Sequence, residues 1–211
     1  MNKSGFSVQK VVVGYFETNC YIIFEKSSKK AFIIDPGADA DLIIGKVSSL
    51  NLMPKGIINT HGHIDHTGAN SEIKSSYNIP VYIHKDDEKF LYDSSLNGSV
   101  FFGEDKKLPK ADVILSDSEI IKESPFEFKV IHTPGHTPGG ICLVIEDIIF
   151  TGDTLFKGSV GRWDLPGGSE KELKNSLKIL NKFPKEMIVF PGHGPESTLK
   201  EEFDTNPYLI K

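Results

Sequence analysis

The chain has 211 residues, of which 38% are hydrophobic and 25% are charged, a balance typical of a globular protein with a sizeable core. Its 29 acidic residues outnumber its 24 basic ones, and the net charge of −5 argues against binding to nucleic acid or to an anionic membrane. No apolar run approaches the ~18 residues of a transmembrane helix, and the N-terminal residues show no secretory signal. We therefore expect a cytoplasmic protein with no nucleic-acid and no membrane partner.

The first part of the chain alternates short apolar runs with amphipathic stretches. β-Branched and aromatic runs between turn residues predict strands, and apolar residues repeated every three or four positions predict helices. In chain order we expect strands over 8–14, 21–24 and 31–34, a helix over 40–50, a strand over 56–59, a helix over 69–77, a strand over 81–83 and a short helix over 86–92. Residues 93–110 have no clear period and predict a loop with some helix.

The second part of the chain is richer in strands. We expect them over 113–115, 126–131, 140–145, 147–150 and 187–190. Ser169 and Glu172 match a helix capping box, and leucines then recur on one helical face. These features predict a helix from Ser169 to about residue 183.

Two parts of the chain repeat the same order of elements. A strand leads to Asp35, then to a helix, and then to a strand that ends just before His61. Later, a strand leads to Asp153, then to a helix, and then to a strand that ends just before His193. This order suggests two similar layers that face each other, with polar residues at the carboxyl ends of the strands, where α/β sheets place their sites. The predicted fold class is therefore α/β.

The strongest chemical signal is a cluster of histidines directly after the strand at 56–59. Within six residues the chain places His61, His63, Asp65 and His66, and Gly62 lets the backbone turn between the first two. Imidazole is the commonest protein ligand for zinc and similar metals. The spacing therefore predicts a metal site at this turn.

Three further glycine-rich turns each follow an apolar strand and carry one side chain of the same type, namely His136, Asp153 and His193. Together with the first turn they supply five histidines and two aspartates. A zinc ion is usually held by three or four protein ligands, so seven are too many for one ion. The set suits two metal ions that share a carboxylate and together activate a water molecule.

At these residues the sequence resembles the metallo-β-lactamase superfamily and, within it, the single-domain bacterial glyoxalase II-like hydrolases (hydroxyacylglutathione hydrolases). The resemblance extends from Asn19 to His193. It implies an α/β fold, a four-layer αββα sandwich with the metal site at one edge of the two sheets. Only 18 residues follow His193, so we expect residues 1–211 to form one such domain without the C-terminal helical domain of typical eukaryotic glyoxalase II.

The resemblance also implies a role for each of the seven side chains. The first metal would be held by His61, His63 and His136, the second by Asp65, His66 and His193, with Asp153 bridging both. The cofactors would be two divalent ions, with zinc expected and iron or manganese as alternatives.

Two other residues are expected to support this site without binding metal. Asp35 ends a strand on the metal side and is expected to orient a ligand histidine. His132 alternates with apolar residues along its strand and is expected to support the loop of His136.

The activity implied by the resemblance is hydrolysis of a thioester of a small thiol, S-lactoylglutathione or a related compound, by a metal-bridging hydroxide. Asp65 is the expected catalytic residue, because it can take up the proton of the attacking water. Arg162 occupies the position of a glyoxalase II basic residue that contacts the glutathione carboxylate, although it could instead pair with Asp164. The oligomeric state is left open.

Other functions remain as alternatives. A persulfide dioxygenase of the same fold would use one iron at His61, His136 and Asp153, a two-histidine, one-carboxylate site. A lactonase is a third enzyme. True β-lactamases of the superfamily are disfavoured because they lack the bridging aspartate. A metal-binding module without activity is disfavoured because all seven ligand positions are filled.

Overall fold

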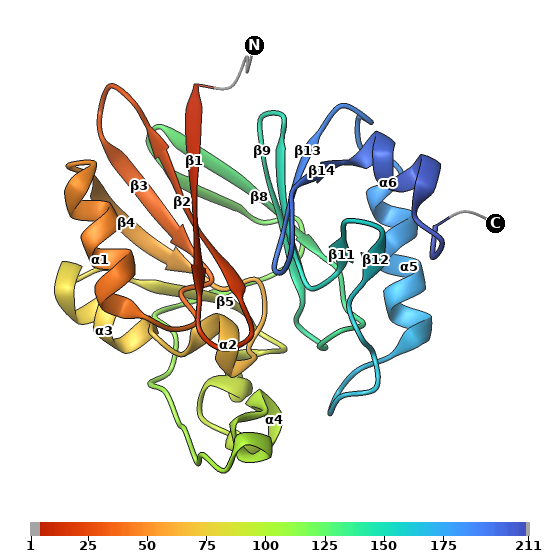
Figure 1. The fold of residues 1–211 in the computed structure, drawn as a ribbon, viewed down its shortest axis with the longest axis horizontal. Helices are drawn as coiled ribbons and strands as arrows, with labels where there is room; N and C mark the ends of the chain where they lie inside the picture. The colour runs from red at the N-terminus through yellow and green to blue at the C-terminus, as the bar shows by residue number, and fades with distance from the viewer. Residues whose placement is uncertain (1–4, 210–211) are drawn as a thin grey trace.

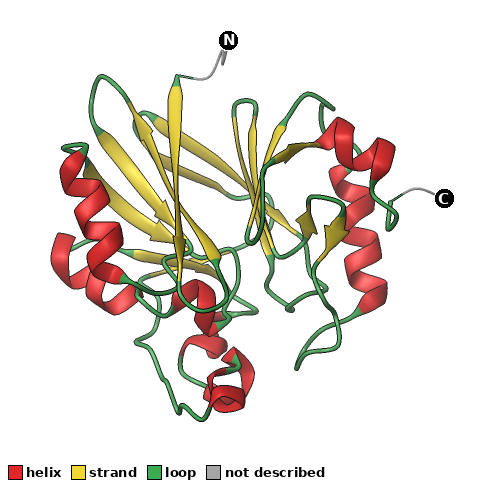
Figure 2. Ribbon diagram, viewed as in Figure 1, coloured by secondary structure: helices red, strands yellow, loops and turns green. Residues whose placement is uncertain are grey.

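The computed structural model describes residues 5–209, which fold into two facing β-sheets with helices on the outside (Figures 1 and 2). Six strands form the first sheet, in the order β1-β2-β3-β4-β5-β6, and six form the second, in the order β14-β13-β10-β9-β8-β7. In Figure 1, α1 and α3 lie outside the first sheet, and α5 and α6 lie outside the second. The layers therefore follow one another as helix, sheet, sheet, helix.

The first half of the chain builds the first sheet and the helices that cover it. Its elements are β1 (Phe6–Val13), β2 (Thr18–Glu25), β3 (Lys30–Ile34), α1 (Ala40–Ser49), β4 (Met53–Ile58), α2 (Ile64–Thr67), α3 (Asn70–Tyr77), β5 (Val81–His84), the 3₁₀ helix η1 (Glu88–Leu91), α4 (Ser94–Asn97), the 3₁₀ helix η2 (Ser99–Phe102) and β6 (Val113–Leu115). Strands β1 to β3 pair antiparallel, and β3 to β6 pair parallel.

The second half builds the other sheet. Its elements are β7 (Ile120–Glu123), β8 (Phe126–His132), β9 (Ile141–Ile145), β10 (Ile148–Gly152), the hairpin strands β11 (Leu155–Phe156) and β12 (Ser159–Val160), α5 (Glu170–Leu180), β13 (Ile188–Pro191), β14 (Ser197–Thr198) and α6 (Leu199–Thr205). β10 and β13 pair parallel, as β3 and β4 do in the first sheet. The repeated order of elements seen in the sequence is therefore also a repeat of structure.

The core lies on both faces of each sheet. Along β3, Phe32 and Ile34 face the other sheet, where Phe32 packs edge-on against Phe128 with the ring centroids 5.2 Å apart. Ile33 points the opposite way, into the cluster that includes Ile43 of α1. Each such side chain contributes about 1.5–3 kcal/mol when it is fully buried. This two-sided burial explains why the strands read as continuous apolar runs.

Every predicted strand and helix is present, and the differences lie in short or polar elements. The helix expected over 86–92 is the 3₁₀ helix η1, and α5 ends at Leu180 because residues 181–183 turn before Pro184. The sequence did not predict α2, β7, β11, β12, β14 or α6. Most are too short to show a period. In α6 the buried face includes Glu202, so its apolar pattern is interrupted. No helix within residues 5–209 is long and apolar enough to cross a membrane.

Candidate metal centre

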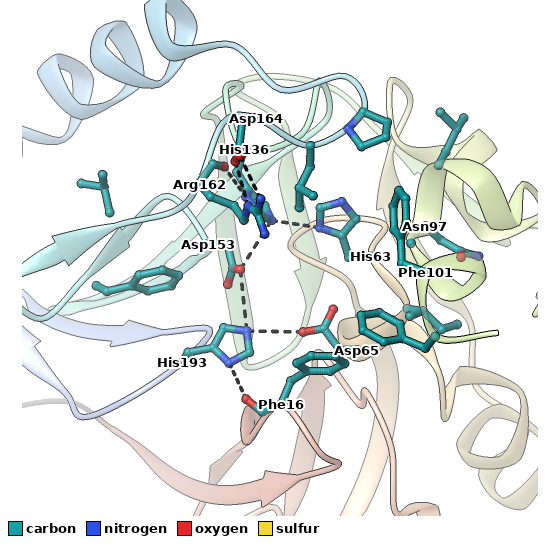
Figure 3. Close-up of a pocket in the computed structure, with 18 of the residues that line it drawn as sticks. Phe16, His63, Asp65, Asn97, Phe101, His136, Asp153, Arg162, Asp164 and His193 are labelled. Carbon is teal, nitrogen blue, oxygen red and sulfur yellow. Dashed lines mark hydrogen bonds and ion pairs between the residues drawn. The ribbon is translucent and has the colours of Figure 1, made fainter. Parts of the chain in front are cut away.

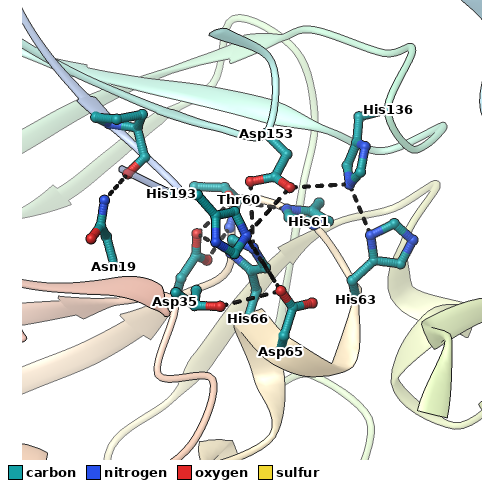
Figure 4. A network of polar contacts seen from close by, with 12 residues as sticks. Asn19, Asp35, Thr60, His61, His63, Asp65, His66, His136, Asp153 and His193 are labelled. Carbon is teal, nitrogen blue, oxygen red and sulfur yellow. Dashed lines mark hydrogen bonds and ion pairs between the residues drawn. The ribbon is translucent and has the colours of Figure 1, made fainter. Parts of the chain in front are cut away.

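The seven side chains predicted as ligands come together where four strands end (Figure 4). His61, His63, Asp65 and His66 follow β4, and the other three follow β8, β10 and β13. Close approach of two of these turns requires glycine at position 192. A Cβ there would lie 2.2 Å from Asp153 Oδ1 and 2.8 Å from His66 Cε1, so any larger residue would push the turns apart.

The first triad consists of His61, His63 and His136. One ligand atom from each lies within 4.8 Å of the other two, and all three side chains are buried. His63 Nδ1 and His136 Nε2 are 2.9 Å apart. These are the three residues predicted to hold the first metal.

The second triad consists of Asp65, His66 and His193, again with one ligand atom from each within 4.8 Å of the others. His66 Nε2 and His193 Nε2 are 3.2 Å apart. Asp65 Oδ2 lies 3.5 Å from the first of these nitrogens and 3.4 Å from the second. This is the predicted second set, formed from two separate turns.

Asp153 lies between the two triads. Its Oδ2 is 3.4 Å from His136 Nε2 and 3.7 Å from His193 Nε2, and its Oδ1 is 3.4 Å from His66 Nε2. It therefore contacts both groups, as a carboxylate shared by two cations must.

Two unpartnered atoms indicate that cations fit this cluster. Both His61 Nε2 and Asp153 Oδ1 are buried and lack a hydrogen-bond partner anywhere in residues 5–209. A buried polar atom without a partner costs about 1–3 kcal/mol, so such atoms in a native protein call for an explanation. Five imidazoles and two carboxylates are ligands typical of zinc and of other divalent transition metals. The donor set therefore fits two such ions.

The electrostatics of the two triads differ. Burial and neighbouring histidines lower the pKa of His61 and bring that of His63 to about 3, so both are neutral, as metal ligands must be. Burial also opposes a charge on His66, but Asp65, Asp153 and Asp35 outweigh it and raise the pKa of His66 to about 10. Three carboxylates thus favour a positive charge beside His66, where a proton and a divalent ion would compete.

In three of the histidines, the ring nitrogen that faces away from the cluster has an oxygen partner. His66 Nδ1 donates to Asp35 Oδ2 at 3.0 Å, and Asp35 also accepts from the Thr60 amide and hydroxyl. His136 Nδ1 lies 2.7 Å from the Arg162 carbonyl oxygen, and His193 Nδ1 lies 3.0 Å from the Phe16 carbonyl oxygen. Such partners set the tautomer and leave Nε2 free to bind metal.

Comparison with known proteins agrees with this geometry. A family model described as the metallo-beta-lactamase superfamily matches residues 13–193. The chain belongs to the metallo-beta-lactamase superfamily.

Individual relatives cover nearly the whole chain. A protein of Haemophilus influenzae named hydroxyacylglutathione hydrolase GloC is 35% identical over 212 residues, which cover 96% of this chain and 98% of that protein. The crystal structure of the BLEG-1 B3 metallo-beta-lactamase superimposes with a TM-score of 0.93 at 37% identity, covering 97% and 100% of the two chains. That of TTHA1623 in a di-iron-bound form gives 0.84 at 36% identity, covering 96% and 100%. The protein is a metallo-hydrolase of this superfamily, and the sandwich fold expected from the sequence is confirmed.

The structure places His132 and Arg162 beside the cluster, whereas a carboxylate oxygen of Asp35 lies within 4.8 Å of ligand atoms of both His61 and His66. Asp35 contacts His66, as described above. His132 Nε2 lies 2.8 Å from the Pro138 carbonyl oxygen, so it contacts the loop of His136 but no ligand histidine. The exposed Arg162 guanidinium binds the Asp164 carboxylate through two hydrogen bonds of 2.8 Å. This is the pairing that the sequence left open.

Two buried residues hold the ligand turns, and the sequence analysis missed both. Asp87 accepts hydrogen bonds from the backbone of Gly62 and Gly139 and from the Thr137 hydroxyl, so it joins the first turn to the loop of His136. Asn19 donates from Nδ2 to the carbonyl oxygens on both sides of His193, those of Pro191 and Gly194. Asp87 stands in a run of charged residues, and Asn19 precedes an apolar run, so neither carried a functional signal.

The cluster forms the floor of an open pocket of about 730 Å³ (Figure 3). Five of the seven predicted ligands line it: His63, Asp65, His136, Asp153 and His193. Arg162 and Asp164 lie on the side of His136, whereas Phe16 and Phe101 lie on the side of Asp65. A small substrate can therefore reach the predicted ligands from solvent.

Proposed function

We propose that the protein hydrolyses thioesters of a small thiol, of the S-lactoylglutathione type, with two divalent metal ions, most suitably zinc. The observation that carries this proposal is the position of Asp153 between the two triads on the floor of an open pocket. The similarity to GloC over nearly the full length supports the thioester as substrate class.

The proposed metal-binding roles are those implied by the family resemblance, and the grouping of the side chains supports them. His61, His63 and His136 would hold one ion, Asp65, His66 and His193 the other, and Asp153 both. When bound, such a pair of ions activates a water molecule and polarises the substrate carbonyl.

Asp65 is the proposed proton acceptor. It lines the pocket, and its Oδ2 accepts a hydrogen bond from the Thr18 hydroxyl at 3.2 Å. Burial favours its neutral form, but His66 and His193 outweigh this and hold the pKa of Asp65 below its usual range. The carboxylate is therefore ionised at neutral pH, the form that a proton acceptor requires.

The reaction is balanced by water alone. The water oxygen bonds to the acyl carbon, the carbon–sulfur bond breaks, and one water proton passes through Asp65 to the leaving thiolate. Because a thiolate is a good leaving group, the reaction needs no dedicated general acid.

Arg162 is the proposed contact for an anionic group on the thiol half of the substrate. It lines the pocket, and its Nε and Nη2 bind Asp164. Nη1 has no hydrogen-bond partner among residues 5–209, so its N–H groups, at one edge of the guanidinium, remain for a substrate carboxylate.

β-Lactam hydrolysis, which the sequence alone disfavoured because of Asp153, is a second candidate in view of the similarity to the BLEG-1 enzyme. A persulfide dioxygenase with one iron at His61, His136 and Asp153 is a third, because His136 lies 3.4 Å from Asp153 and belongs to the same triad as His61. The di-iron form of TTHA1623 supports iron as an alternative metal.

The deciding experiment measures metal content and three activities on protein purified without added metal. The substrates are S-lactoylglutathione, a chromogenic cephalosporin, and glutathione persulfide with oxygen uptake as the readout. We expect about two metal ions per chain and hydrolysis of the thioester. One iron per chain with persulfide-dependent oxygen uptake, or cleavage of the cephalosporin alone, would refute the proposal.

A further inference from the structure

One side of the pocket is lined by three phenylalanines, Phe16, Phe101 and Phe102, which we call the aromatic wall. Phe16 lies in the turn between β1 and β2, and the other two lie in η2. The rings of Phe16 and Phe102 pack edge-on with centroids 4.8 Å apart, although they come from segments more than eighty residues apart. The wall is therefore a product of the tertiary structure.

The wall is unusually exposed for apolar side chains. Exposed fractions are 40% for Phe16, 62% for Phe101 and 57% for Phe102. Exposed apolar surface costs about 25 cal/mol per Å², and several large rings gathered in a concave site are typical of ligand binding. A bound hydrocarbon group would cover these rings.

The aromatic wall adjoins the cluster of predicted metal ligands. The Phe16 carbonyl oxygen lies 3.0 Å from His193 Nδ1, and Ile64, next to Asp65, lines the same pocket. A group bound against the wall would thus lie beside the reacting centre and not on a remote surface.

Charge distinguishes the two sides of the pocket. Apart from the predicted ligands, the charged residues that line it within residues 5–209 are Arg162 and Asp164. Both lie beside His136, away from Phe16 and Phe101 (Figure 3). Apart from the predicted ligand Asp65, the side of the wall offers a substrate no charged side chain to pair with.

We propose that the aromatic wall binds an apolar acyl group, aryl or alkyl, so that the enzyme prefers thioesters of apolar acids to those of acetic acid. This inference rests on the proposed thioester hydrolysis. The charged side of the pocket, at Arg162, takes the thiol half of the substrate, and the acyl half lies opposite it, against the rings.

The test compares phenylacetyl and acetyl thioesters of N-acetylcysteamine, an uncharged thiol. The parent protein should have the higher kcat/KM for the phenylacetyl thioester. Phe101→Ala and Phe102→Ala should lower that value on the order of tenfold and change the acetyl value less than about twofold. Leu42→Ala is the control, because Leu42 is 52% exposed on α1, outside the first sheet, and does not line the pocket. It should leave both values unchanged.

A second readout does not depend on catalysis. Calorimetric binding of the amide analogues of both substrates, which cannot be hydrolysed as thioesters, should show tighter binding of the phenylacetyl compound in the parent and not in Phe101→Ala. If neither thioester is hydrolysed, the proposed function fails, and this binding measurement alone decides whether the wall is an apolar subsite.

Several results would overturn the inference. They are a parent that prefers the acetyl compounds, equal losses for both thioesters in the wall variants, or the same loss in Leu42→Ala. Conversion of a dimeric parent to a monomer by Phe101→Ala, measured by light scattering, would instead make the wall an interface between two copies of the chain.

Discussion

Replacement of Asp87 by asparagine should lower both the stability of the protein and its affinity for metal, although Asp87 is not a predicted ligand. Its Oδ2 accepts from the Gly62 amide at 2.9 Å and from the Thr137 hydroxyl at 2.7 Å, and its Oδ1 accepts from the Gly139 amide at 2.6 Å. Gly62 lies between His61 and His63. The carboxylate therefore joins the two loops that carry the first triad.

The cost can be worked out from these three bonds. If the amide NH₂ takes the place of Oδ1, the Gly139 amide loses its acceptor. If it takes the place of Oδ2, the Thr137 hydroxyl can turn and accept, but the Gly62 amide loses its acceptor. In either orientation one buried N–H faces another donor, which costs about 1–3 kcal/mol. For a chain of this size each kcal/mol corresponds to a shift in Tm of roughly 2–4 °C.

The assay has two parts. Thermal unfolding of EDTA-treated protein should show a fall in Tm of roughly 2–12 °C for Asp87→Asn. Competition with a chromophoric chelator should show that zinc binds about 10–100-fold more weakly, as expected when a group that orients ligands is lost. Glu186→Gln, an exposed carboxylate in the loop before β13, is the control and should change neither value. A Tm within about 1 °C of the parent together with unchanged zinc affinity would refute this reasoning.

Three other outcomes are expected. Asp153→Ala should lose metal and activity but keep its circular dichroism spectrum, because Asp153 lies on a turn beside an apolar core; parent-like turnover would contradict its bridging role. Arg162→Ala should raise KM for a carboxylate-bearing thioester by the equivalent of about 1–3 kcal/mol and leave KM for a neutral thioester unchanged. An equal rise in KM for both thioesters would mean that Arg162 only pairs with Asp164 and does not contact the substrate. Burial lowers the pKa of His84 in the folded protein to about 4. In the unfolded chain this histidine has its ordinary pKa of about 6.5, so between these two values the unfolded chain binds a proton that the folded protein does not. The free energy of unfolding should therefore fall as the pH is lowered from about 6.5 to about 4. In EDTA-treated His84→Gln, Tm should fall less over that window, and superimposable pH profiles would argue against a contribution from this histidine.

The elements that the sequence predicted are those with a local signal. Strands such as β3 and β10 are buried on both faces, so their apolar runs are unbroken, and α5 combines a serine cap with leucines on one face. The elements that were missed have no such signal. The two-residue strands β11, β12 and β14 are too short for a period, and α6 buries the carboxylate of Glu202, which accepts from the Gly158 amide.

The seven predicted ligands could be found in the sequence because each comes soon after an apolar strand, on a short turn or, for Asp65 and His66, in the four-residue helix α2. A strand and the residue at its end are neighbours in the chain, and parallel strands end at the same edge of a sheet, so local order carries over into space. The grouping of the ligands into triads came from the resemblance to a known family, and the contacts of Asp153 with both triads agree with it.

Only the tertiary structure could bring out the residues that hold and surround these ligands. In the sequence, Asp87 lies 25 residues from Gly62 and 52 from Gly139. Phe16 contacts Phe102 although strands β2 to β5 lie between them in the sequence. Neither pair has a sequence pattern, because a single hydrogen bond or ring contact imposes no period on its neighbours. An aspartate among charged residues is expected to be exposed to solvent, and a pair of adjacent phenylalanines is expected to be buried in the core. The packing of the two sheets decides which loops meet at the edge where the strands end. As a result, Asp87 is buried and the rings of the aromatic wall stay exposed.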